Sequence, residues 1–144
     1  MRVVNALSLS LLLLSSGCAN LVSLDWSREI GWILPDPELG GVIEFPDTVR
    51  RAVPTTGIVT TRGSSSCTRP AGEDVTGDGI EVRITPYDRM APPGRGCTRD
   101  LAAFPRSVEL RFMVAGEASI RVVGRASPVS RETVEVVHEV IVLP

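Results

Sequence analysis

The three cysteines, Cys18, Cys67 and Cys97, carry the most reactive side chains of this 144-residue sequence. A thiol can be acylated, oxidised to a disulfide, or deprotonated to bind a metal ion. An odd number of cysteines is unusual in a secreted protein, because one of them has no partner within the chain. The residues around each cysteine therefore decide which chemistry is expected of it.

Cys18 ends a segment with the layout of a secretory signal peptide. Arg2 supplies a positive charge, and residues 3–14 are mostly apolar. The small residues at 15–17 lead directly into the cysteine. The apolar run is shorter than the ~20 residues that a membrane-spanning helix needs, so a removable leader is favoured over a permanent anchor or a buried N-terminal helix.

This segment resembles the lipobox of bacterial lipoproteins, because its small residues run into a cysteine rather than an A-x-A-like cleavage site. In that family the cysteine thiol receives a diacylglyceryl group, the leader is cut in front of it, and the new amine is usually acylated, with palmitate as the expected chain. The family prefers Leu, Val or Ile three residues before the cysteine. This chain has Ser15 there and Leu14 one place earlier.

The resemblance implies a signal peptide over residues 1–17, a lipidated N-terminus and tether over 18–27, and a folded domain over 28–144. Two or three acyl chains give stable anchoring, whereas one gives marginal binding. Residue 19 is alanine, not the aspartate that often retains such lipoproteins in the inner membrane. The expected location is the cell envelope, at the outer membrane facing the periplasm if the source is Gram-negative. An envelope protein is the expected partner.

With Cys18 acylated, Cys67 and Cys97 remain as one possible disulfide in an oxidising compartment. Closing a loop of about 30 residues removes roughly 3.5 kcal/mol of entropy from the unfolded chain in the chain-entropy model. The alternatives are two free thiols or a metal site. A metal site needs more ligands than two cysteines and the distant His138 supply, so no metal is expected.

The composition argues against nucleic-acid binding. The formal net charge is −2, so no basic excess exists to hold nucleic acid or anionic lipid. All 15 basic residues are arginine, which we attribute to genome composition rather than to function. Aromatic residues make up only 4% of the chain, which disfavours a stacking platform for sugars or bases. No cofactor is expected.

Three further groups of residues are candidates for a chemical function, but none of them has a pattern that requires one. His138 lies among valines on one face of an expected strand, where a core histidine is more common than a catalyst. The run Glu73–Gly79 is rich in carboxylates and could bind calcium, but it lacks the EF-hand spacing and is more simply a turn. Ser64–Ser66 belongs to no nucleophile motif and predicts a flexible loop tip.

Arg83, Arg111 and Arg121 occupy outward positions of three expected strands and could form a basic stripe across a sheet. Glu81 and Glu109 are interleaved with them in the sequence. Cross-strand salt bridges on a solvated face are therefore the favoured interpretation.

The remaining pattern is that of β-strands. We expect short strands at 30–34 and 42–45, an extended connector or strand at 48–53, and a strand at 58–61. Residues 62–79 and 86–96 are expected to be long loops that flank an alternating strand at 80–85. A helical turn is possible at 98–104. The strongest alternation, at 108–114 and 118–123, predicts a β-hairpin, and residues 133–143 predict a final long strand.

About seven strands without βαβ rhythm indicate an all-β antiparallel β-sandwich, immunoglobulin-like or fibronectin-like, with a small barrel as the alternative. The layout also resembles that of uncharacterised β-sandwich lipoproteins of bacteria. Function tends to reside on loops that a rigid scaffold holds. The candidate contact surface is accordingly the pair of cysteine-bearing loops and their neighbours, with Arg69, Tyr87, Asp88, Arg89, Arg95 and Arg99.

The sequence therefore predicts a lipid-anchored, non-catalytic binding or structural module. Strand addition at an exposed sheet edge is one available mode of binding. One alternative is a small hydrolase-like enzyme that uses His138. Another is a carrier of a small apolar ligand, which requires an internal cavity.

Overall fold

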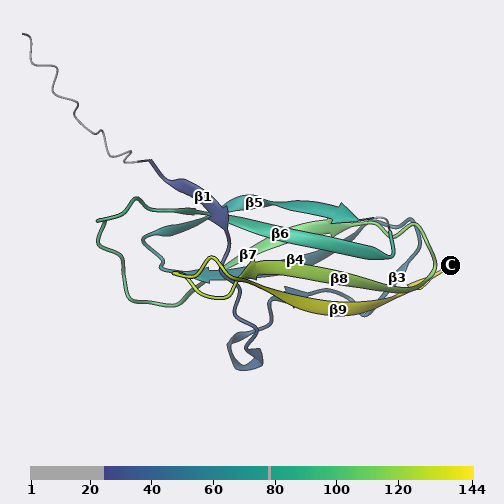
Figure 1. Cartoon of the computed structure of the whole chain (residues 1–144). Helices are drawn as coiled ribbons and strands as arrows, with labels where there is room; N and C mark the ends of the chain where they lie inside the picture. The colour runs from purple at the N-terminus through teal and green to yellow at the C-terminus, as the bar shows by residue number, and fades with distance from the viewer. Residues whose placement is uncertain (1–24, 78) are drawn as a thin grey trace, which may run out of the picture.

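The chain folds into β-strands that run along one long axis (Figure 1). The computed structural model describes residues 25–77 and 79–144, so Cys18 and the predicted leader lie outside the described residues. The strands are β1 (Ser27–Ile30), β2 (Ile43–Glu44), β3 (Thr48–Arg50), β4 (Thr55–Gly63), β5 (Thr68–Gly77), β6 (Glu81–Met90), β7 (Ala102–Leu110), β8 (Gly116–Arg125) and β9 (Thr133–Leu143). A short 3-10 helix, η1 (Pro37–Leu39), follows β1.

The strands form two sheets. The larger sheet has the order β1-β6-β8-β9-β3, with β5 also paired to β6, and the smaller has the order β2-β4-β7. Both β1 and β5 pair with the last residues of β6, so they occupy opposite edges of that strand. Strand β8 pairs with the first residues of β6, on the edge that it shares with β1. The described residues thus contain nine strands, more than the seven or so expected.

The core lies between the two sheets, which pack against each other. Residues from the small sheet and from the large sheet join one buried cluster: Ile33, Val42, Val49, Val59, Val82, Ile84, Val108, Leu110, Phe112, Ala118, Ile120, Val122, Val140 and Val142. Most are β-branched, which suits a pleated and half-buried surface. Burying each such side chain contributes about 1.5–3 kcal/mol. The all-β class is confirmed.

The predicted hairpin over 108–123 is wrong. Strand β7 pairs with β4 in the small sheet, whereas β8 pairs antiparallel with β9 and parallel with β6 in the large sheet. The chain crosses between the sheets after Leu110, and Phe112 is buried on the way with 1% exposure. Alternation in the sequence reports which residues face the core. It does not report which sheet a strand joins, and this crossover was missed for that reason.

One of the predicted loops is largely strand, and the other is strand over its first five residues. Residues 62–79 contain β5, and the expected loop at 86–96 begins with the last five residues of β6. Strand β5 has no alternating apolar pattern because nearly all of its side chains are exposed or half-buried at the sheet edge. The helical turn considered at 98–104 is also wrong, since β7 begins at Ala102.

The first strand lies earlier than expected. Residues 27–30 form β1, whereas Trp32 makes only isolated bridges to Arg62 and Arg125. Ser27 was assigned to the tether, yet it pairs with Met90. The described chain therefore joins the large sheet almost as soon as it begins, at the end of the molecule opposite the C-terminus (Figure 1).

Candidate functional site

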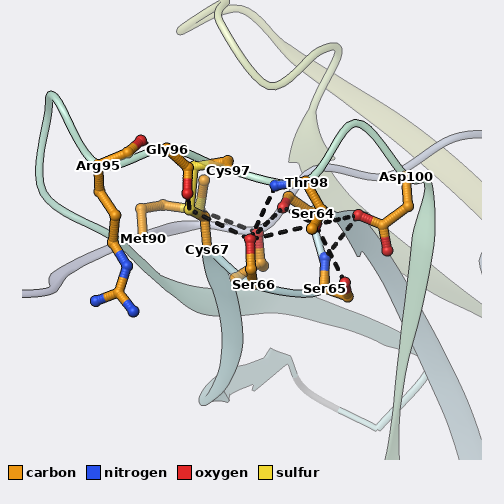
Figure 2. Close-up of a disulfide and its surroundings, with 11 residues drawn as sticks. Ser64, Ser65, Ser66, Cys67, Met90, Arg95, Gly96, Cys97, Thr98 and Asp100 are labelled. Atoms are coloured by element: carbon orange, nitrogen blue, oxygen red, sulfur yellow. Dashed lines mark hydrogen bonds between the residues drawn. A yellow bond between two sulfur atoms is a disulfide. The ribbon is translucent and has the colours of Figure 1, made fainter.

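A disulfide joins Cys67 and Cys97, as predicted (Figure 2). Cys67 is buried in the turn just before β5, and Cys97 is exposed on the loop that follows β6. The two Cα atoms lie 5.6 Å apart, well within the range that a disulfide requires. The bond fixes the 91–101 loop to the turn between β4 and β5.

A network of hydroxyl groups reinforces this connection (Figure 2). The Oγ atoms of Ser64, Ser65 and Ser66 lie 2.9, 3.2 and 3.2 Å from Thr98 Oγ1. The backbone N–H of Ser65 donates to Asp100 Oδ1 at 3.2 Å. Hydrogen bonds from the side chains of Thr98 and then Ser65 lower the pKa of Asp100 to about 2. The serine run is thus tied to the second loop, where a flexible tip was predicted.

Next to the disulfide, arginine side chains lie over two aromatic rings. The guanidinium carbons of Arg69 and Arg95 lie 4.5 and 5.6 Å from the ring centre of Trp26. Arg28 lies 3.6 Å from the ring centre of Tyr87. Such cation–π contacts contribute about 0.5–1 kcal/mol each at exposed sites. They hold the start of the described chain against β5, β6 and the 91–101 loop.

Three arginines line a surface hollow of about 450 Å³, which we call the arginine hollow: Arg28, Arg69 and Arg89, with Pro70, Ala71 and Gly72. The hollow forms where β5 bulges, because the register with β6 shifts between Pro70 and Glu73. Gly72 adopts φ = +84°, a conformation that favours glycine. Asp74 is the acidic group at its edge, 3.7 Å from Arg28. The hollow therefore offers arginine donors in excess of its carboxylates.

A buried arginine–carboxylate pair lies beneath this hollow. Arg106 of β7 forms an ion pair with Asp88 of β6 at 2.5 Å, and the two side chains are only 7% and 1% exposed. Arg106 also donates to Thr61 Oγ1 at 2.6 Å, and to the backbone carbonyls of Tyr87 at 2.6 Å and Gly72 at 3.0 Å. One residue thus links both sheets and holds the backbone of the bulge.

The structure brings together most of the predicted contact residues. Arg69, Tyr87, Arg89 and Arg95 surround the same corner of the molecule, and Arg99 is exposed on the disulfide-linked loop. The prediction is wrong for Asp88, which is only 1% exposed because it pairs with Arg106 between the sheets. The sequence reasoning missed Trp26 and Arg28, which it left in and beside the tether. A tryptophan just before the first strand, in a chain with few aromatic residues, was the available signal.

His138 lies at the margin of the core. Its side chain is 21% exposed, its Nε2 lies 3.4 Å from Asp47 Oδ1, and its ring packs edge-on against Phe45 at 6.4 Å. A nucleophile completing a catalytic triad would hydrogen-bond to this ring. Within residues 25–77 and 79–144, the Nε2 atom of His138 is buried and has no hydrogen-bond partner.

The outer face of the large sheet carries the predicted salt bridges. Arg121 lies 2.9 Å from Glu81 and 2.6 Å from Glu135, and Arg83 lies 3.8 Å from Glu135. The Glu135 side-chain hydrogen bond, followed by the charge of Glu81, raises the pKa of Arg121. Arg111 follows the end of β7 and does not belong to this face. Two of the three proposed stripe arginines are therefore paired.

The carboxylates considered for calcium do not gather into a site in the described part of the chain. Residues 73–77 belong to β5, where Asp74 contacts Arg28, and Asp78 lies outside the described residues. No group of three or more metal-ligating side chains occurs among residues 25–77 and 79–144.

Two of the edge strands, β5 and β7, are poorly suited to strand addition. Strand β5 is interrupted by Pro70 and by the bulge after it, and β7 contains Pro105. Proline cannot donate a backbone hydrogen bond, and bulges break the ladder that an added strand would continue. The loops at the disulfide end are the better candidates for binding.

No family model, curated protein or solved structure matches this chain. Within the described ranges, the structure also contains no helix with the length and apolar character needed to cross a membrane.

Proposed function

We propose that this chain is a bacterial lipoprotein, anchored to an envelope membrane by acyl chains on Cys18, whose folded part is a non-catalytic binding or structural module. We further propose that the two packed sheets are an immunoglobulin-like or fibronectin-like β-sandwich. The parallel pairs β6–β8 and β3–β9 depart from a purely antiparallel sandwich.

The observation that carries the proposal is the partition of the three cysteines. Cys67 and Cys97 are joined to each other, which leaves Cys18 as the cysteine outside the disulfide. That cysteine follows directly on a short apolar leader. Acylation needs only one thiol, so it accounts for the cysteine that lies outside the disulfide without a second thiol or a metal ion.

The binding face that we propose is the disulfide end, for contact with an envelope protein or with the membrane itself. The 91–101 loop is fixed there by a covalent bond and by the Thr98 network. Loops held in this way lose little conformational entropy when they bind, which favours recognition. The exposed arginines and the two aromatic rings supply polar and stacking contacts at the same corner.

Cell fractionation tests the anchor. Wild-type protein expressed with its own leader should sediment with membranes and partition into detergent. The Cys18→Ser variant lacks the acceptor thiol and should not acquire acyl chains. The proposal is supported if this variant no longer partitions into detergent. A Ser15→Leu variant, which restores the residue that the family prefers, should behave as the wild type does. Both proteins are also expressed in cultures that contain labelled palmitate. The proposal is refuted if Cys18→Ser and wild type partition equally and neither protein carries the label.

A further inference from the structure

The charged side chains of the domain are not distributed evenly along its long axis. Arg28, Arg69, Arg89 and Arg95 lie close together at the disulfide end, through the pairing of β1, β5 and β6 and the stacking on Trp26. Of these, Arg28 also pairs with Asp74. Away from this end, Arg83 and Arg121 are paired with glutamates, whereas Arg50 and Arg111 are exposed on other elements. A chain whose net charge is slightly negative thus has a local basic surface, which the overall composition did not predict.

The residues at this surface are of the kinds that contact lipid headgroups. Arginine presents a planar set of donors that matches phosphate, and tryptophan and tyrosine favour the membrane–water interface. Leu101, on the same disulfide-linked loop, is 44% exposed. The acidic neighbours are partly engaged elsewhere. Glu29 pairs with Arg125 at 2.8 Å, and Asp100 accepts from Ser65.

The position of this surface in the chain indicates that its partner is the membrane. The described chain begins at Asp25, beside Trp26, and Cys18 precedes Asp25 by seven residues. Seven residues span at most about 25 Å when fully extended. An acyl group on Cys18 therefore keeps this end of the domain, which lies opposite the C-terminus, within reach of the membrane surface (Figure 1).

We propose that the arginine hollow, with Trp26 and Arg95 beside it, binds the phosphate groups of anionic lipid headgroups in the anchoring membrane. The orientation in this inference rests on the proposed lipid anchor, whereas the affinity for anionic lipid rests on the arginines. The buried Arg106 supports the site from below, because it holds the carbonyls of Gly72 and Tyr87. Anchoring raises the local headgroup concentration, so weak individual contacts suffice to orient the domain.

Vesicle sedimentation tests the affinity without the anchor. The protein for this experiment is the mature chain from residue 18 with Cys18→Ser, secreted behind an ordinary cleavable leader, which keeps every described residue. At low ionic strength it should bind vesicles of equimolar phosphatidylcholine and phosphatidylglycerol more tightly than vesicles of phosphatidylcholine alone. Added salt should weaken this preference, because exposed charges are screened.

Two double variants identify the surface responsible. Arg69→Gln with Arg89→Gln should lower binding to the anionic vesicles by about 25-fold, at about fivefold for each arginine. The matched control, Arg50→Gln with Arg111→Gln, removes the same charge from exposed arginines away from the hollow and should change binding far less. Equal binding to both vesicle types, or equal losses in the two double variants, overturns the inference. So does binding to an acidic protein with no preference for anionic lipid.

A second measurement uses the anchored protein. In nanodiscs that contain phosphatidylglycerol, the fluorescence of Trp26 should be quenched by headgroup-labelled lipid, in a Trp32→Phe background that removes the other tryptophan. Unquenched Trp26 also overturns the inference. Failure of the anchor is distinguishable, because an unacylated Cys18 leaves the vesicle result standing, and indifferent vesicle binding leaves an acylated Cys18 standing.

Discussion

Two of the arginine–carboxylate pairs in this molecule lie in sharply different environments. Arg106 and Asp88 lie between the sheets with 7% and 1% exposure, and Arg106 donates to three further oxygens. Arg121 and Glu135 lie on the outer face of the large sheet with 33% and 32% exposure. Solvent screens the second pair, whereas the first has little solvent to replace a lost partner. An arginine–carboxylate pair thus forms a structural link in one place and part of a solvated surface in the other.

The largest effect is expected from breaking the buried pair. Asp88→Ala leaves the Arg106 guanidinium without its counter-charge and should lower the free energy of unfolding by about 3–5 kcal/mol. Urea denaturation measures the change. The double variant Asp88→Leu with Arg106→Met removes both charges together and should recover much of the loss. A loss below about 1 kcal/mol for Asp88→Ala would place this pair in the same class as a surface salt bridge.

Removing the disulfide should have the next largest effect. Cys67→Ala with Cys97→Ala frees a loop of 30 residues and should cost about 3.5 kcal/mol of unfolding free energy, on the chain-entropy model. The single variant Cys97→Ala separates the cross-link from the packing of the buried Cys67. Alkylation of the native wild type should label neither cysteine until a reductant is added. Labelling before reduction would contradict the disulfide.

The exposed pair should contribute little. Arg121→Gln should change the free energy of unfolding by at most about 1 kcal/mol, because both partners remain accessible to water. The change should shrink further at high salt, whereas that of Asp88→Ala should persist. Denaturation of both variants at low and high salt makes the comparison direct. A salt-independent loss of several kcal/mol for Arg121→Gln would remove the distinction between the two regions.

The smallest effect concerns Asp100, which is fully exposed and has a pKa lowered to about 2. A depressed carboxyl pKa stabilises the folded state above the unfolded value of about 3.9, and this stabilisation is lost as the pH falls towards 2. The difference in unfolding free energy between wild type and Asp100→Ala should therefore be present at pH 5 and vanish near pH 2. A difference that is constant over this range would contradict the hydrogen bonds from Thr98 and Ser65.

The sequence predicted those parts of the fold that bury one face. Strands β6, β8 and β9 were found because valine and isoleucine alternate with charged residues along them. Strand β5 was missed because its side chains stay at the exposed sheet edge, where no apolar pattern is required. The sheet to which β7 belongs could not be inferred, since pairing between distant strands leaves no local trace in the sequence.

The candidate site was predicted in part for a similar reason. The cysteines and loop arginines were visible as residue types, and the disulfide brings them together. The Arg106–Asp88 pair was not visible, because its members lie 18 residues apart on different sheets and look like ordinary surface charges in the sequence. Trp26 was assigned to the tether because the sequence did not reveal that Arg69 and Arg95 stack on it.

The central claim, an acylated Cys18, is tested most directly by mass spectrometry of the N-terminal peptide of the protein purified from bacterial membranes. The account predicts a mature chain that begins at Cys18 and carries a diacylglyceryl group, with a further acyl chain on its amine. A chain that still begins at Met1, or a mature N-terminus without lipid, would contradict it.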